Sequence, residues 1–194
     1  MDPASRAATP FPWDALSGKA LIYASLGTIQ NKHLTTFARI AEACQHLDAQ
    51  LVIALGGGSS PDAVPPLPGE PLVVEFAPQL ELLQRASLTI THAGLNTVLE
   101  SLGCAVPMVA IPIVNDQPGV AARVAWTGTG AVVPIKSATV QKLRSAINRV
   151  WTDPSYRNNA QRLQNAIAAS GGVVRAADIV EQAIRTGVPV LTEQ

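Results

Sequence analysis

The segment THAGLNTVLE, residues 91–100, places a histidine, a glycine and a glutamate directly after the apolar run SLTI. Apolar residues then recur at helical spacing, at Leu95, Val98, Leu99 and Leu102. This spacing predicts a helix that begins near Gly94 and turns these four side chains toward the core. The free N–H groups at a helix start favour an anion, and a glycine lets the anion approach the backbone closely. Because His92 can donate a further hydrogen bond, we interpret the segment as a candidate diphosphate site.

The remaining sides of the same helix carry Asn96, Thr97 and Glu100, which we expect to face water or a ligand. Thr97 and Glu100 are three residues apart and share one side of the helix, with Glu100 a turn further along. A diphosphate at the helix start would place an attached ribose near Glu100, whose carboxylate can accept hydrogen bonds from both ribose hydroxyls. The alternative is a capping box formed by Thr97 and Glu100, although the apolar periodicity begins before Thr97.

Short apolar runs that can form buried strands alternate with helical patterns over residues 19–190. The runs are residues 19–27, 50–55, 72–76, 87–91, 106–111 and 130–133. The clearest helical patterns cover residues 31–44, 139–151, 155–169 and 174–186. The alternation predicts a doubly wound, Rossmann-like α/β domain, with a parallel sheet of about six strands and helices on both faces. Residues 1–18, rich in Pro, Ala and Ser and without periodicity, are predicted to be a linker or tail.

Polar and glycine-rich segments follow the predicted strands, at the edge of the sheet where open parallel sheets bind ligands. They are residues 25–28 (SLGT), 56–60 (GGGSS), 76–79 (FAPQ), 91–100 and 112–118 (PIVNDQP). Each has an ordinary structural explanation as well. A lone histidine at a strand end is more often structural, Asp116 can cap a helix that starts at Pro118, and the glycines at 56–58 lack the GK[ST] of a P-loop and predict a turn. Their common position favours a binding site.

The composition limits the possible classes of function. The chain has 194 residues, of which 47% are hydrophobic and 14% charged, with a formal net charge of zero. A nucleic-acid binder would usually show a basic stripe, and no apolar run reaches the length of a membrane span or resembles a signal-peptide core. Cys44 and Cys104 lack metal-like spacing, so we interpret both as small buried residues of a reducing compartment. We expect a soluble, cytoplasmic domain.

The stretch FAPQLELLQRASLTITHAGLNTVLESLGCAVPMVAIPIVNDQ, residues 76–117, resembles the signature of the UDP-glycosyltransferase family. That pattern runs aromatic-x-Pro-Gln, His-x-Gly-x-Asn-Ser/Thr, a Glu, Val-Pro-Met and Asp-Gln, and every element occurs here in order. The segment ASLGT, residues 24–28, is similar to the first strand and loop of the family's second domain. The resemblance covers residues 11–186 and is closest to bacterial zeaxanthin and macrolide-type glucosyltransferases. It implies the C-terminal, donor-binding half of a GT-B fold.

For the nucleoside end of the donor, the resemblance implies four contacts. The ring of Phe76 would stack on uracil, and the backbone of Ala77 would hydrogen-bond the base. Gln79 would reach the ribose, and Glu100 would hold the ribose hydroxyls, as the helix geometry suggests independently. Phenylalanine at position 76, in place of the tryptophan of plant members, should still stack and leaves the choice between uracil and thymine open.

For the diphosphate, the resemblance implies contacts from His92, from the region of Asn96 and Thr97, and from Ser25 or Thr28. Gly94 belongs to the same group through its place at the helix start.

For the sugar, the resemblance implies hydrogen bonds from Asp116 and Gln117 to its hydroxyls. The donor is expected to be UDP-glucose, transferred with inversion by direct displacement at the anomeric carbon. The protein would supply positioning and stabilise the leaving diphosphate, with no metal and no other cofactor. The acceptor would be a small, lipophilic molecule with a hydroxyl group.

One departure from the family pattern concerns the first domain. Family members have two domains that face a cleft, and this chain resembles only the second. The general base, usually a histidine, and most of the acceptor pocket belong to the first. His33 and His46 fall in or beside the first predicted helix, so no catalytic residue is assigned in this chain. We expect it to bind the nucleotide sugar and to transfer little alone, with an N-terminal domain joined in cis or as a separate subunit. Peripheral membrane attachment would come through that domain.

Three other functions remain open at this point. A non-catalytic nucleotide-binding or interaction module could have kept the pocket without the chemistry. Half of a nucleotide-sugar epimerase would need acid and base carboxylates near the sugar, where the sequence offers only Asp116. A dinucleotide oxidoreductase is the least favoured, because SLGTIQ differs from the expected G-x-G-x-x-G.

Overall fold

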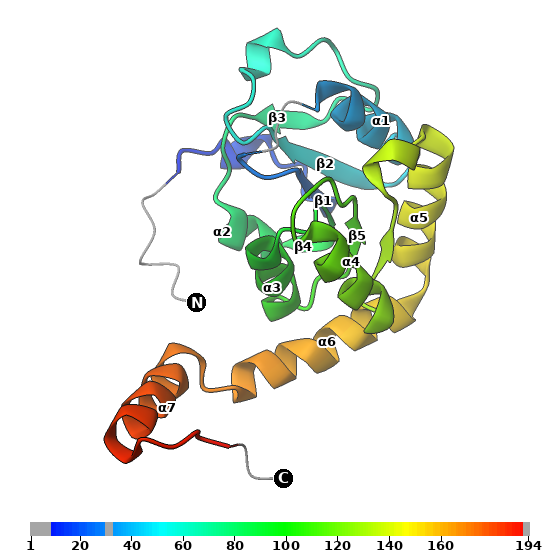
Figure 1. Ribbon diagram of the computed structural model, residues 1–194. Coiled ribbons are helices and arrows are strands. Elements are labelled where there is room, and N and C mark those ends of the chain that lie inside the picture. Colours follow the sequence, from blue (N-terminus) through cyan, green and yellow to red (C-terminus); the bar gives the residue numbers. More distant parts are fainter. Residues whose placement is uncertain (1–8, 30–32, 192–194) are drawn as a thin grey trace.

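The computed structural model describes residues 9–29 and 33–191, which form one parallel sheet with helices on both faces (Figure 1). The strands are β1 (Ala20–Ser25), β2 (Ala49–Ala54), β3 (Leu72–Val74), β4 (Ala86–Thr91), β5 (Met108–Ala110) and β6 (Gly130–Val132). The helices are α1 (Leu34–Cys44), α2 (Gln79–Leu83), α3 (Leu95–Gly103), α4 (Gln117–Trp126), α5 (Val140–Thr152), α6 (Pro154–Ala169) and α7 (Gly172–Thr186). The predicted doubly wound, Rossmann-like α/β fold is confirmed.

The strand order β3-β2-β1-β4-β5-β6 puts a topological switch point between β1 and β4. From β1 the chain builds outward through β2 to β3, then returns to β4 and builds outward in the other direction. The last residues of these two strands, Ser25 and Thr91, are paired neighbours. In such sheets a crevice forms at the carboxyl ends of the strands beside the switch point, so ligands bind there.

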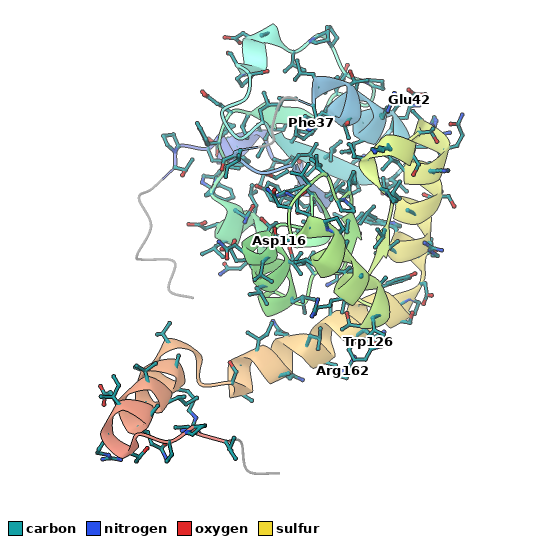
Figure 2. All side chains as sticks on the ribbon, viewed as in Figure 1. Phe37, Glu42, Asp116, Trp126 and Arg162 are labelled. Carbon is teal, nitrogen blue, oxygen red and sulfur yellow. The ribbon has the colours of Figure 1, made fainter. Side chains whose placement is uncertain are left out.

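Alternating side chains of the strands build a core on each face of the sheet. On one face, Ile22 and Ile53 pack with α1 and α5, including Phe37, which Figure 2 labels on α1. On the other face, Leu21 and Val52 pack with α2, and a separate cluster joins β5 to α3, α4 and α6. Both faces of the sheet are therefore covered by packed helices.

Local sequence signals fix the boundaries of the two helices that follow β6. The side chain of Thr139 accepts a hydrogen bond from the backbone N of Lys142 and so caps α5. Asp153 caps α6 through the backbone N of Ser155, and Pro154 occupies the first helical position, where its missing N–H costs nothing. These caps account for the close match between predicted and observed boundaries.

The orientation of α3 differs from the prediction. Val98 and Leu102 are buried as expected, but Leu95 and Leu99 are 50% and 39% exposed. The buried side of the helix runs instead through Ser101, whose hydroxyl donates to the backbone O of Thr97 at 2.8 Å and to Thr89 Oγ1 at 3.4 Å. This small residue lies against β4, so the helix turns Leu95 and Leu99 outward.

The same rotation brings Glu100 inside, where it is only 4% exposed. Glu100 does not face water, but it lines a cavity at the carboxyl ends of the strands, in agreement with the prediction that it faces water or a ligand.

Part of the segment predicted as a linker or tail packs against the domain. Phe11, Trp13 and Leu16 contact the cluster around Leu21, and the guanidinium of Arg85 lies 4.3 Å from the ring centroid of Trp13. Residues 1–8 of that segment lie outside the described residues.

The cysteines differ in burial. Cys44 is buried as predicted, whereas Cys104 is half-buried at the end of α3. Burial raises the pKa of the Cys44 thiol to about 12, which keeps the thiol protonated and unreactive.

At the C-terminal end, α7 extends away from the sheet and its covering helices (Figure 1). It carries no buried residue, and its apolar side chains Val173, Val174, Val180 and Ile184 are exposed. Within the described ranges, no helix is long and apolar enough to cross a membrane.

Candidate functional site

A cavity of about 620 Å³ lies at the carboxyl ends of the central strands. Every residue that the sequence predicts to contact the donor lines it: Ser25, Thr28, Phe76, Ala77, Gln79, His92, Gly94, Asn96, Thr97, Glu100, Asp116 and Gln117. They come from the segments that follow β1, β3, β4 and β5. The topology thus brings together residues that lie far apart in the sequence.

The imidazole of His92 is held between two glycines. A Cβ at Gly27 would lie 2.8 Å from its Nε2, and a Cβ at Gly94 would lie 2.5 Å from the same atom. Only glycine leaves room for the ring on these two sides. Among the described residues, Nδ1 of His92 is a buried atom without a hydrogen-bond partner.

Burial lowers the pKa of His92, and the nearby carboxylate of Asp116 partly opposes this effect. The ring is therefore neutral at neutral pH, and an anion beside it would raise its pKa.

The turn from β4 into α3 borders the cavity through Gly94. Ala93 adopts a left-handed conformation with φ 65° although it is not glycine, and its backbone N donates to Thr91 Oγ1 at 3.2 Å. Gly94 then forms the N-cap of α3 without a side chain to cap it. Since the first turn of α3 lines the cavity, this end of the helix suits an anion. The capping box proposed for Thr97 and Glu100 is wrong, because the helix begins before Thr97.

Glu100 lies one turn further along α3, in a network of hydrogen bonds. Gln79 Nε2 donates to Glu100 Oε2 at 2.6 Å and to Thr97 Oγ1 at 3.4 Å. The hydroxyl of Tyr23 donates to Gln79 Oε1 at 3.2 Å. A carboxylate held in this way offers fixed acceptors to the hydroxyls of a ligand.

Phe76 forms the other wall of the cavity. A Cβ at Gly57, which has φ 79°, would lie 2.7 Å from Phe76 Cζ, so the ring packs directly against the backbone there. The side chain is nevertheless 49% exposed. Such a ring, supported on one side and open on another, suits a planar ligand group.

Asp116 and Gln117 mark the start of α4, and Figure 2 labels Asp116 there. Asp116 is exposed and its side chain makes no capping hydrogen bond, so the capping explanation is not supported. Gln117 is buried, and its Oε1 accepts from the backbone N of Ile113 at 2.8 Å and of Val114 at 3.0 Å. The amide of Gln117 therefore shapes the loop after β5.

A family model described as UDP-glucoronosyl and UDP-glucosyl transferase matches residues 7–168. The chain belongs to this UDP-glycosyltransferase family. Among its relatives, the zeaxanthin glucosyltransferase of Pantoea ananas is 36% identical over 178 residues, which are 91% of this chain and 41% of the relative. The zeaxanthin glucosyltransferase of Pseudescherichia vulneris is 39% identical over 165 residues, which are 84% of this chain and 40% of the relative. The family resemblance is confirmed.

Solved glycosyltransferase structures share the fold of this UDP-glycosyltransferase domain. The glycotransferase of kitacinnamycin superposes with a TM-score of 0.80 at 31% identity, over 91% of this chain and 46% of its own. The calicheamicin glycosyltransferase CalG4 gives a TM-score of 0.79 at 30% identity, over 89% of this chain and 45% of its own. The chain thus spans less than half the length of these proteins and corresponds to their C-terminal half.

The UDP-glycosyltransferase domain also has cavity residues that sequence reasoning missed: Tyr23, Gly27, Ile29, Ala54, Gly56, Leu95 and Asn115. Gly56 was expected only to form a turn. A Cβ on it would collide with the backbone O of Gly27, so the loops after β1 and β2 approach each other closely. The run of three glycines that begins at Gly56 could have indicated a close approach, but it does not show that the neighbouring loop is the one after β1.

Proposed function

We propose that this chain binds a UDP-sugar, with UDP-glucose as the expected donor, and serves as the donor half of an inverting glycosyltransferase. The observation that carries the proposal is the arrangement along α3, with an uncapped helix start beside His92 and a buried carboxylate at Glu100 one turn further along. Relatives named as glucosyltransferases support the choice of sugar.

In the proposed complex the donor spans the cavity. Uracil stacks on Phe76 and reaches the backbone of Ala77, and the ribose hydroxyls bind Glu100 and Gln79. The diphosphate lies at the start of α3 beside His92.

Further contacts complete the diphosphate and sugar ends. The hydroxyls of Ser25 and Thr28 and the first turn of α3, with Asn96 and Thr97, face the diphosphate. Asp116 and Nε2 of Gln117 face the sugar, since Oε1 of Gln117 is already engaged by the loop.

The proposed reaction is a single displacement. The acceptor oxygen forms a bond to the anomeric carbon as the bond from that carbon to the diphosphate oxygen breaks, and the acceptor proton passes to a base. That base and the acceptor pocket would belong to an N-terminal half. This chain would stabilise the charge that develops on the leaving diphosphate, through the N–H groups of α3 and through His92.

No metal ion is expected at the proposed site. Within the part of the chain that the structure describes, no three His, Cys, Asp or Glu side chains are grouped to hold one. The epimerase alternative is not favoured, because the acidic residues lining the cavity are Asp116 and Glu100, and Glu100 is assigned to the ribose in this proposal. A cytoplasmic location stays a prediction.

Titration calorimetry with UDP, UDP-glucose, dTDP and NAD tests the proposal. We expect UDP and UDP-glucose to bind and NAD to bind at least about tenfold more weakly, because nothing at the SLGT loop forms a dinucleotide fingerprint. Binding of NAD without binding of UDP would refute it. A preference for dTDP over UDP would support the donor site but show that the preferred base is thymine and not uracil.

The affinity for UDP-glucose should rise as the pH falls below about 7. Burial lowers the pKa of His92, and the diphosphate should raise it, so the complex holds a proton more tightly than the free protein does. Each unit of difference gives about a tenfold gain in affinity, which is lost as the pH rises through the pKa of the complex. Calorimetry from pH 5 to 8 measures this slope, with UDP-glucose preferred because the terminal phosphate of UDP titrates near pH 6.

The His92→Gln variant should lose this pH dependence. The matched control is His46→Gln, which changes an exposed histidine that does not line the cavity. An unchanged slope in His92→Gln would show that another group titrates.

A further inference from the structure

Tyr23 contributes a buried hydroxyl to the floor of the cavity. The residue lies on β1, is only 2% exposed, and packs its ring in the core cluster with Leu21 and Val52. Its side chain nevertheless lines the cavity. A buried phenol normally finds a hydrogen-bond partner, and this one donates to Gln79 Oε1 at 3.2 Å.

This hydrogen bond determines how the amide of Gln79 is oriented. With Oε1 engaged by Tyr23, Nε2 points at the Glu100 carboxylate, 2.6 Å away, and at Thr97 Oγ1, 3.4 Å away. The flipped amide would place its oxygen against the negatively charged Glu100 and its NH₂ group against the phenol. The two contacts therefore favour the same orientation and reinforce each other.

The amide of Gln79 is thus engaged at both ends inside the protein. Besides making the ribose contact expected of Gln79, this amide therefore sets the position of Glu100. Glu100 is itself buried at the ribose end of the proposed donor site, so a small rotation of its carboxylate would misalign the acceptors.

We propose that Tyr23 is a positioning residue for the ribose, which acts through Gln79 to hold the carboxylate of Glu100 toward the two ribose hydroxyls. This inference rests on the proposed function. Tyr23, Gln79 and Glu100 would together favour a ribose over a 2′,3′-dideoxyribose.

The Tyr23→Phe variant tests the inference, because it removes one oxygen and keeps the ring. Comparing the affinities for UDP and for 2′,3′-dideoxy-UDP by calorimetry separates the contribution of the ribose hydroxyls from those of the base and the diphosphate. We expect the affinity for UDP to fall roughly three- to tenfold, the effect of one aligned hydrogen bond, and the affinity for the dideoxy compound to change less than about twofold. A purely structural role would lower the melting temperature and weaken both ligands equally, and that result would overturn the inference.

Gln79→Met provides the second test, since it keeps the length of the side chain without the amide. It should reproduce the selective loss, and adding Tyr23→Phe to it should have no further effect. If the two effects multiply instead, Tyr23 does not act through Gln79. Tyr156→Phe is the matched control, because it removes the same hydroxyl from a half-buried tyrosine outside the cavity and should leave both affinities unchanged.

Binding of UDP by the unmodified chain distinguishes failure of the proposed function from failure of the role of Tyr23. If it fails to bind UDP, both the proposed function and this inference fall. If it binds UDP but Tyr23→Phe weakens both compounds alike, only the role of Tyr23 falls.

Discussion

Joined to the N-terminal half of a related glycosyltransferase, this chain should transfer glucose at least a thousandfold faster than it does alone. A general base contributes about 10²- to 10⁴-fold to such reactions, and the positioning of the acceptor contributes more. Neither is expected from a chain that matches only 41% of the Pantoea ananas zeaxanthin glucosyltransferase. The N-terminal half of that enzyme is a suitable partner, and chromatography of glucosylated zeaxanthin together with release of UDP measures the rate.

The same hybrid with Glu100→Ala is the control that shows whether transfer depends on the cavity of this chain. It should transfer much more slowly at low UDP-glucose concentrations. If the chain alone transfers as fast as the folded hybrid, the assignment of the base to another domain is wrong. If the folded hybrid binds UDP-glucose and transfers nothing, a non-catalytic binding module becomes the better explanation.

The second large effect is expected for Glu100→Ala in the chain alone. The variant would lose the two hydrogen bonds proposed between the ribose hydroxyls and the carboxylate, and Gln79 would lose its partner at 2.6 Å, so the affinity for UDP should fall about a hundredfold. The affinity for free pyrophosphate should change less than about threefold, because the helix start and His92 are untouched. Calorimetry with the two ligands gives the comparison.

Glu81→Ala is the matched control, since it removes an exposed carboxylate from α2 that does not line the cavity. It should leave both affinities unchanged. Equal losses for UDP and pyrophosphate in Glu100→Ala would count against a ribose contact. Glu100→Gln should give an intermediate loss, since its amide keeps the size but not the charge.

The position of the cavity could be predicted from the sequence because parallel strands end at the same edge of a sheet. Once the six apolar runs are recognised, the segments that follow them must meet, and the residues at 25–28, 76–79, 91–100 and 112–117 do so. The rotation of α3 could not be predicted in the same way. The helical spacing of residues in α3 is compatible with two overlapping buried sides, one through Leu95 and Leu99 and one through Ser101. Only packing against β4 selects between them.

Tertiary contacts account for the other misses. Tyr23 sits in an apolar run with few polar residues, so the sequence does not show which face its hydroxyl reaches. The fit of His92 between Gly27 and Gly94 joins two loops that only the sheet brings together. The docking of Phe11 and Trp13 arises in a segment whose sequence has no periodicity that would indicate it.

The pairing of β1 with β4 has a consequence for how the domain folds. These two strands are separated in the chain by α1, β2, β3 and α2, so their contact closes a long loop and is expected to form slowly. Because Ser25 and Thr91 become neighbours only at that step, no intermediate that lacks it can possess the proposed nucleotide site. A bound donor would therefore stabilise the finished domain and would not stabilise intermediates that lack the β1–β4 pair.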